Sequence, residues 1–392
     1  FRRVLFRSVA GSLNLFGQKQ NDENILAYKI NATGRFADDY SAPSGNVGDS
    51  AHTSVTSGKV FNSGAQEFDA SGIVGYKTQS GIYKFKYSHF GQKYFIAPKP
   101  GRREVELNIH TNNYDTLPAA PSQEIMHERA ELSANIPTSL ARYELSGVFQ
   151  YNSRKEEGVK ESEEDEIYKE EHGIKPEVKL DLLTFSLNAK AHHLPLGNLF
   201  GTIGVSTNVQ MNSTLGQKAI IPNYDATNIA AFVYEEYKLL EHLRLTGGFR
   251  FDTRNLSVEK NEVDSLPPFS KQKLNYSAAT GTAGISFQPI EEFAISFNYG
   301  NGWRSPTASE LYTYGIDEGT VRFKIGNAAL IPELSHNIDV TAKYNSRLLY
   351  AEFSVYQNSI QDYIYLQPTT LNISGFTTYQ YTQTNATLKE IG

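Results

Sequence analysis

Cysteine is absent from this chain of 392 residues, and methionine and tryptophan are scarce, with 2 Met and 1 Trp. The lack of cysteine excludes disulfide scaffolds, thiolate zinc sites, iron–sulfur clusters and cysteine nucleophiles. A formal net charge of −6 does not provide the basic surface that nucleic-acid binding requires, so we expect no nucleic-acid partner. The mean hydropathy is −0.44 and no apolar run reaches about 18 residues, so no transmembrane helix is expected.

Catalytic motifs are missing as well. The chain has no Gly-rich phosphate loop after a strand, no HExxH zinc motif and no Gly-x-Ser-x-Gly nucleophile elbow. We therefore expect neither an enzyme nor a resident cofactor. Tyrosine and phenylalanine are abundant instead, with 24 and 22 residues. A long, polar, aromatic-rich chain is typical of a transmembrane β-barrel, whose strands are apolar only at alternate positions.

Polar and apolar residues alternate with a period of two along much of the chain. In the segment 242–252 one face carries Leu243, Leu245, Phe249 and Phe251, and the other carries Arg244, Thr246, Arg250 and Asp252. These runs reach about 9–13 residues, which suits a membrane strand of roughly 9–11 residues better than a soluble strand of 5–6. The aromatic residues on the apolar faces are expected to contact lipid; they include Tyr83, Phe85, Tyr87, Phe293 and Tyr299.

The spacing of these runs predicts about fifteen strands. They lie at 9–16, 25–40, 67–76, 80–90, 124–136, 140–153, 178–192, 200–212, 226–238, 242–258, 273–287, 291–302, 337–346, 348–361 and 376–389. Short connections alternate with long ones, and the long ones are 41–66, 91–123, 154–177, 213–225, 259–272, 303–336 and 362–375. This sorting predicts an all-β, antiparallel transmembrane barrel with short periplasmic turns and long extracellular loops.

Two motifs in the longest predicted loop go beyond a generic barrel pattern. Residues 301–315 read NGWRSPTASELYTYG, and residues 326–337 read GNAALIPELSHN. Both resemble motifs of the TonB-dependent outer-membrane receptors. The matching positions are Arg304, Pro306, Thr307, Glu310, Leu311, Tyr312, Gly326, Asn327, Leu330, Pro332, Glu333 and Ser335. The chain departs from the family pattern at Trp303, where Phe is usual, and at Asp339, where Glu is common.

The resemblance covers most of the chain and is nearest to the zinc-uptake branch. It implies an outer-membrane location, contact with membrane lipid, and active uptake of a scarce nutrient by a monomer. The family has a plug domain that contacts the TonB complex and a barrel of 22 strands. We therefore interpret residues 9–392 as a partial barrel, about 15 strands of 22 without the plug, and residues 1–8 as a non-native leader.

Three hypotheses for the ligand stay open. The first is a metal ion, especially zinc; the second is a ferric siderophore, haem or cobalamin; the third, from another class, is a passive porin or structural barrel. Residues 156–171 hold nine acids against two lysines, a charge of −7, and this run could attract cations. The candidate metal ligands are His172, Glu170, Glu171, His110 and Asp165, because imidazole and carboxylate groups suit Zn²⁺. The candidate aromatic ligand contacts are Trp303, Tyr312 and Tyr314.

Overall fold

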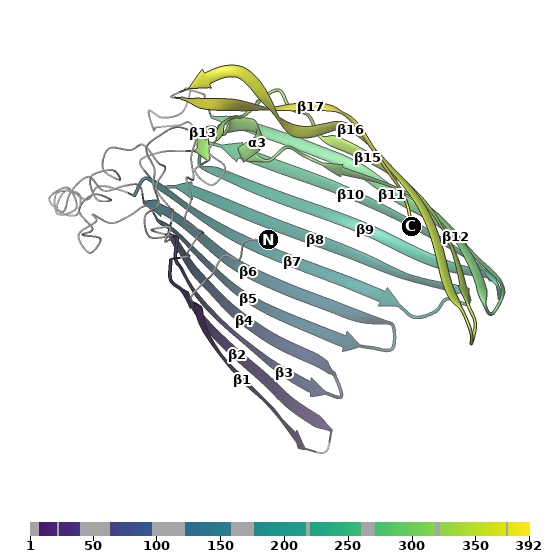
Figure 1. The fold of residues 1–392 in the computed structure, drawn as a ribbon. Helices are drawn as coiled ribbons and strands as arrows, with labels where there is room; N and C mark the ends of the chain where they lie inside the picture. Colours follow the sequence, from purple (N-terminus) through teal and green to yellow (C-terminus); the bar gives the residue numbers. More distant parts are fainter. Residues whose placement is uncertain are drawn as a thin grey trace.

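The computed structural model describes residues 8–21, 23–39, 63–95, 122–157, 176–216, 220–259, 271–317, 322–373 and 375–392. These residues form one curved β-sheet of seventeen strands, which we call the barrel wall (Figure 1). The first eight strands are β1 (Ser8–Asn21), β2 (Asn24–Ala37), β3 (Ala65–Thr78), β4 (Gly81–Phe95), β5 (Ser122–Pro137), β6 (Ala141–Glu157), β7 (Val178–His193) and β8 (Leu199–Thr214). The next four are β9 (Tyr224–Leu240), β10 (Leu243–Val258), β11 (Gln272–Ile290) and β12 (Phe293–Arg304). After helix α3 (Ala308–Tyr312) come β13 (Tyr314–Asp317), β14 (Arg322–Ile325), β15 (Glu333–Asn345), β16 (Tyr350–Ile373) and β17 (Phe376–Ile391).

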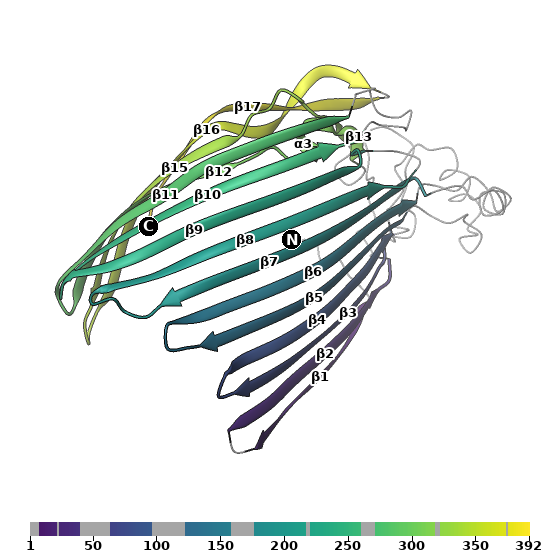
Figure 2. The same cartoon turned by 180° about the vertical axis from the view of Figure 1, so that it is seen from behind.

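The long strands follow one another around the wall as an antiparallel meander. Each pairs with the next in the chain, except that β12 pairs with β15 because α3, β13 and β14 are inserted between them. Strand β14 also pairs with β17 in parallel. The two views show an open wall, with β1 at one side and the β16–β17 hairpin at the other (Figures 1 and 2).

The prediction of an antiparallel all-β barrel wall is confirmed, and the fifteen long strands lie close to the predicted positions. The predicted loop at 362–375 is wrong, because β16 continues to Ile373 and β17 starts at Phe376. Two register shifts, at Ile360/Tyr363 and Pro368/Asn372, break the two-residue period that the sequence pattern depends on. The predicted loop at 303–336 contains three short elements that were not expected.

The two faces of the wall differ in chemistry. The outer face exposes large apolar side chains, such as Leu132 at 65%, Ile203 at 58% and Phe249 at 54%. The opposite face, which we call the lumenal face, carries Arg250, Asp252 and their polar neighbours as well as the inserted segment with α3. Within the described part of the chain, no helix is long and apolar enough to cross a membrane.

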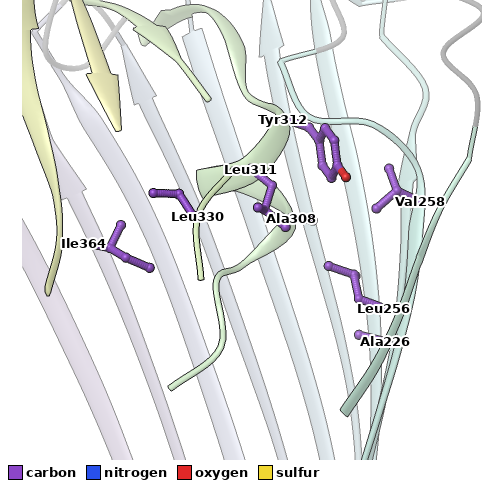
Figure 3. Close-up of a cluster of buried hydrophobic side chains, with 8 residues drawn as sticks. All are labelled: Ala226, Leu256, Val258, Ala308, Leu311, Tyr312, Leu330 and Ile364. Carbon is purple, nitrogen blue, oxygen red and sulfur yellow. The ribbon is translucent and has the colours of Figure 1, made fainter. Parts of the chain in front are cut away.

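The buried core is small and lies where α3 meets the lumenal face. Ala226 of β9 and Leu256 and Val258 of β10 contact Ala308, Leu311 and Tyr312 of the helix, together with Leu330 and Ile364 (Figure 3). Ile364 belongs to β16, which is separated from β10 by several strands of the wall. The inserted segment therefore connects two distant parts of the wall across the lumenal face.

Candidate functional site

The residues of the two motifs meet around one arginine. Arg304 ends β12, and its Nη1 lies 2.8 Å from Glu310 Oε2, while its Nη2 lies 2.7 Å from Glu333 Oε1. Arg304 Nε also donates to Glu333 Oε2 at 3.0 Å, so Arg304 binds the Glu333 carboxylate in a bidentate geometry. Charge-assisted contacts of this geometry are stronger than neutral hydrogen bonds. The first motif is thus joined to the second by Arg304.

Glu310 has a second role at the start of α3. The Thr307 hydroxyl accepts a hydrogen bond from the Glu310 backbone N–H, and the Glu310 carboxylate accepts one from the Thr307 backbone N–H. This reciprocal capping box satisfies two backbone donors that the end of a helix leaves free. The spacing Thr-x-x-Glu in the sequence therefore fixes where the five-residue helix begins.

The second motif fastens the inserted segment to its surroundings. Asn327 donates from its backbone to Glu310 O at 2.9 Å and from its side chain to Tyr381 O at 3.2 Å. Gly326 lies so close to the helix that a Cβ atom would meet backbone atoms of Leu311 and Tyr312 at 2.6 Å. Glu333 Oε1 accepts a further hydrogen bond from Ile364 N at 2.6 Å.

The remaining motif residues mostly complete this packing. Pro306 is fully buried, and Leu311 and Leu330 are 2% and 5% exposed in the core cluster of Figure 3. Ser335 lies on β15 opposite Gly302 and Ile360, and Pro332 precedes that strand. The motifs that carry the resemblance thus connect strands β9 and β10 to strand β16 across the lumenal face.

The three candidate aromatic contacts lie in different environments. Trp303 is opposite Leu334 and shares the outer face of β12 with Tyr299, so its position is that of an interfacial aromatic residue. Tyr312 is 8% exposed, and its hydroxyl donates to Gln272 Oε1 at 2.7 Å. Burial raises the pKa of the Tyr312 phenol. Tyr314 packs edge-on against Phe323 at 4.9 Å. The structure does not bring the three rings together.

The candidate metal ligands His172, Glu170, Glu171, His110 and Asp165 lie outside the described residues. Two acids of the acidic run are described, and both have basic partners: Glu156 pairs with Arg154 and Glu157 with Lys155. Within the part of the chain that the structure describes, no three His, Asp or Glu side chains are grouped so that they could hold a metal ion.

The lumenal face also carries a row of polar side chains across β7 to β11, which the sequence does not predict. Its members lie directly opposite one another on consecutive strands from β7 to β11; they are Ser186, Asn208, Asn228, Arg254 and Tyr276. The alternation within each strand places these residues on the lumenal face. Only the register of five strands brings them level, and register cannot be read from the separate sequence segments.

An antiparallel wall with an apolar outer face and a polar lumenal face defines this molecule as an outer-membrane β-barrel protein. A family model described as the β-barrel of TonB-dependent receptor-like proteins matches residues 6–389. The chain therefore belongs to the TonB-dependent receptor β-barrel family, whose barrels lie in the bacterial outer membrane.

Individual relatives agree with this assignment. The rhizobactin receptor of Rhizobium meliloti (strain 1021) is 24% identical over 132 residues, which are 30% of this chain and 18% of that protein. The solved structure of the copper transporter OprC is 15% identical, with a TM-score of 0.66 over 100% of this chain and 58% of that chain. The Serratia marcescens hemophore receptor HasR, a double mutant in complex with its hemophore HasA and haem, is 14% identical with a TM-score of 0.64, over 99% of this chain and 60% of that one. The chain thus spans less than two thirds of the length of each of these relatives.

Proposed function

We propose that this barrel is the membrane-spanning part of a receptor that takes up a metal chelate, such as a ferric siderophore, by TonB-dependent active transport. The match to the family model over residues 6–389 is the observation that carries the proposal. In this proposal the ligand enters from the extracellular side, and a plug domain of the complete receptor contacts the TonB complex. The proton-motive force supplies the energy, and the ligand is not chemically converted.

The choice of a chelate rests on the relatives and on the lumenal face. The relatives described above include a rhizobactin receptor, a copper transporter and a hemophore receptor in complex with its hemophore and haem. Among the described residues no His and carboxylate side chains are grouped as a zinc ion would need, and the candidate zinc ligands His172 and His110 lie outside those residues. A polar wall with many hydrogen-bonding groups suits the larger, oxygen-rich surface of a chelate.

A transport assay tests the proposal. A bacterial strain that lacks the complete receptor gene is supplied with radioactive iron bound to citrate or to a hydroxamate chelator. We expect the complete receptor to restore uptake, and deletion of TonB or collapse of the proton-motive force to abolish the uptake. Uptake that persists without TonB would identify a passive porin instead.

A binding assay separates the chelate from a bare metal ion. The complete receptor in detergent is titrated calorimetrically with Zn²⁺ and, separately, with the ferric chelates. We expect saturable binding of a chelate and none of Zn²⁺. Saturable Zn²⁺ binding that is lost on replacing His172 or His110 with alanine would support a zinc receptor and contradict the chelate proposal.

A further inference from the structure

The row from Ser186 to Tyr276 forms a continuous polar shelf on the lumenal face. Asn208 Nδ2 donates to Ser186 Oγ at 2.8 Å, and Asn228 Nδ2 donates to Asn208 Oδ1 at 3.4 Å. Arg254 Nη1 donates to Asn228 Oδ1 at 3.4 Å and thus ends the chain of side-chain hydrogen bonds. Four of the five residues on the shelf are uncharged. Arg254 is therefore its single charged group.

Arg254 differs from the other arginines that the long described strands of the wall carry on the lumenal face. Each of the others has a carboxylate oxygen within 3.3 Å; they are Arg35, Arg129, Arg142, Arg154, Arg244, Arg250 and Arg304. No carboxylate of a described residue comes within 4.0 Å of Arg254, and its Nε is buried without a hydrogen-bond partner. A half-buried guanidinium without a counter-ion in contact is costly, because both its solvation and its pairing are incomplete.

The neighbouring carboxylates are already engaged. Asp252, two residues along β10, accepts Arg250 Nε at 2.8 and 3.0 Å and Arg250 Nη2 at 2.8 Å. Glu310 attracts Arg254 only from a distance, since its oxygens contact Arg304 and cap α3. The guanidinium has five N–H donors, and the structure uses one of them, toward Asn228. The shelf therefore has free donor capacity and a positive local field.

The surroundings of Arg254 favour an oxygen-rich partner. Tyr276 lies directly opposite on β11 and adds a phenol, while Leu256, the next lumenal residue along β10, belongs to the apolar cluster beneath α3. On the other side the neighbouring lumenal positions opposite Asp252 are the small residues Ala230 and Ala278. A planar anion can thus approach Arg254 beside the small side chains of Ala230 and Ala278, next to the part of the wall that α3 covers.

We propose that Arg254 is an anion-binding contact of the lumen, which takes a carboxylate or another deprotonated oxygen of an anionic metal chelate. This inference rests on the proposed function and assigns the charge class of its ligand. A carboxylate fits the planar fork of a guanidinium with two parallel hydrogen bonds, which the point charge of a lysine cannot reproduce. The amides of Asn208 and Asn228 and the phenol of Tyr276 then offer hydrogen bonds to further oxygens of the same ligand.

The test uses the complete receptor purified in detergent, with ferric citrate as an anionic probe and a neutral ferric trihydroxamate as the comparison. The Kd of each probe is measured calorimetrically for the wild type and for R254Q, R254K and R244Q. Arg244 is a matched control because it lies on the lumenal face of the same strand and pairs with Glu236 at 3.3 Å. We expect R254Q to raise the Kd for ferric citrate about 10- to 100-fold and R254K to recover only part of that loss. R244Q is expected to change the Kd by less than about threefold.

The outcomes separate this inference from the proposed function. A wild-type receptor that binds neither chelate would overturn the proposed function and the role of Arg254 with it. Wild-type binding that R254Q retains in full would overturn the role of Arg254 alone. Thermal unfolding of each variant is recorded in parallel. If R254Q lowers the unfolding temperature while its Kd is unchanged, Arg254 is a packing residue or a partner of another part of the receptor, and the inference is wrong.

Discussion

At the scale of single residues, the partners of an arginine decide what it contributes. Arg304 holds two carboxylates whose side chains are only 15% and 11% exposed, whereas Arg244 meets one carboxylate that is 34% exposed. Exposed ion pairs contribute about 0–1 kcal/mol, because water screens them and both side chains lose entropy. Removal of Arg304 leaves two poorly solvated carboxylates close to each other, which costs more.

The substitution Arg304→Gln tests this difference. We expect it to lower the free energy of unfolding by roughly 2–3 kcal/mol, a value reduced for the partial exposure of Arg304. Urea unfolding of the complete receptor in detergent measures the effect, and Arg244→Gln is the control with an expected loss under about 1 kcal/mol. Equal losses in the two variants would show that the contacts of Arg304 with Glu310 and Glu333 do not stabilise the barrel more than an exposed ion pair does.

At the scale of elements, the extension of β16 pairs with β17 on one side only, and side chains take the place of β15 on its other side. The β15 ladder with β16 runs from Leu334/Gln361 toward the short turns, so the part of β16 beyond Gln361 has no β15 partner. The side chain of Gln383 connects this part of β16 to Ile331, which lies just before β15. Its Oε1 accepts from Ile331 N at 2.9 Å, and its Nε2 donates to Ile331 O at 2.8 Å and to Asp362 O at 2.7 Å. Asp362 has a φ of 55°, at the point where the β16–β17 register shifts.

The substitution Gln383→Leu removes these hydrogen bonds and keeps a similar volume. We expect the Ile331 amide to exchange with solvent about two- to tenfold faster, because its acceptor is lost and a typical hydrogen bond contributes about 0.5–1.5 kcal/mol. Hydrogen exchange read by mass spectrometry on peptides around 331 and 362 measures this effect. Gln380→Leu is the matched control, since Gln380 is exposed on the same strand. Equal protection of Ile331 in all three proteins would contradict the role of Gln383.

The elements also show how far the sequence predicts this structure. The long strands are predictable because each repeats its two-residue period many times, as β10 does with Phe249 and Phe251. Helix α3 has five residues, which is too short to display a 3.6-residue period, although its Thr307 and Glu310 capping pair is visible in the sequence. The unpaired state of Arg254 depends on the register of neighbouring strands and on which arginine Asp252 contacts, and neither can be read from the sequence.

At the scale of the whole molecule, the wall separates two solvents. The outer face exposes Phe249 and Ile203, which would be unfavourable in water and is favourable against lipid tails. The lumenal face of the same strands carries ion pairs such as Arg250–Asp252 and Arg142–Glu144. A charge added to one face should therefore have a very different effect from the same charge added to the other.

The pair of substitutions Phe249→Arg and Thr282→Arg tests this asymmetry at similar depth. Phe249 is 54% exposed near the middle of β10, and Thr282 is an exposed residue on the lumenal face of the neighbouring strand. Arginine at the lipid face near the bilayer midplane costs roughly 2–4 kcal/mol, because the guanidinium loses its water. We expect Phe249→Arg to lower the unfolding free energy of the complete receptor in lipid vesicles by about that amount and Thr282→Arg by less than about 1 kcal/mol. The reverse order would mean that the two faces have been assigned the wrong way round, and the lumenal position of Arg254 would be lost with it.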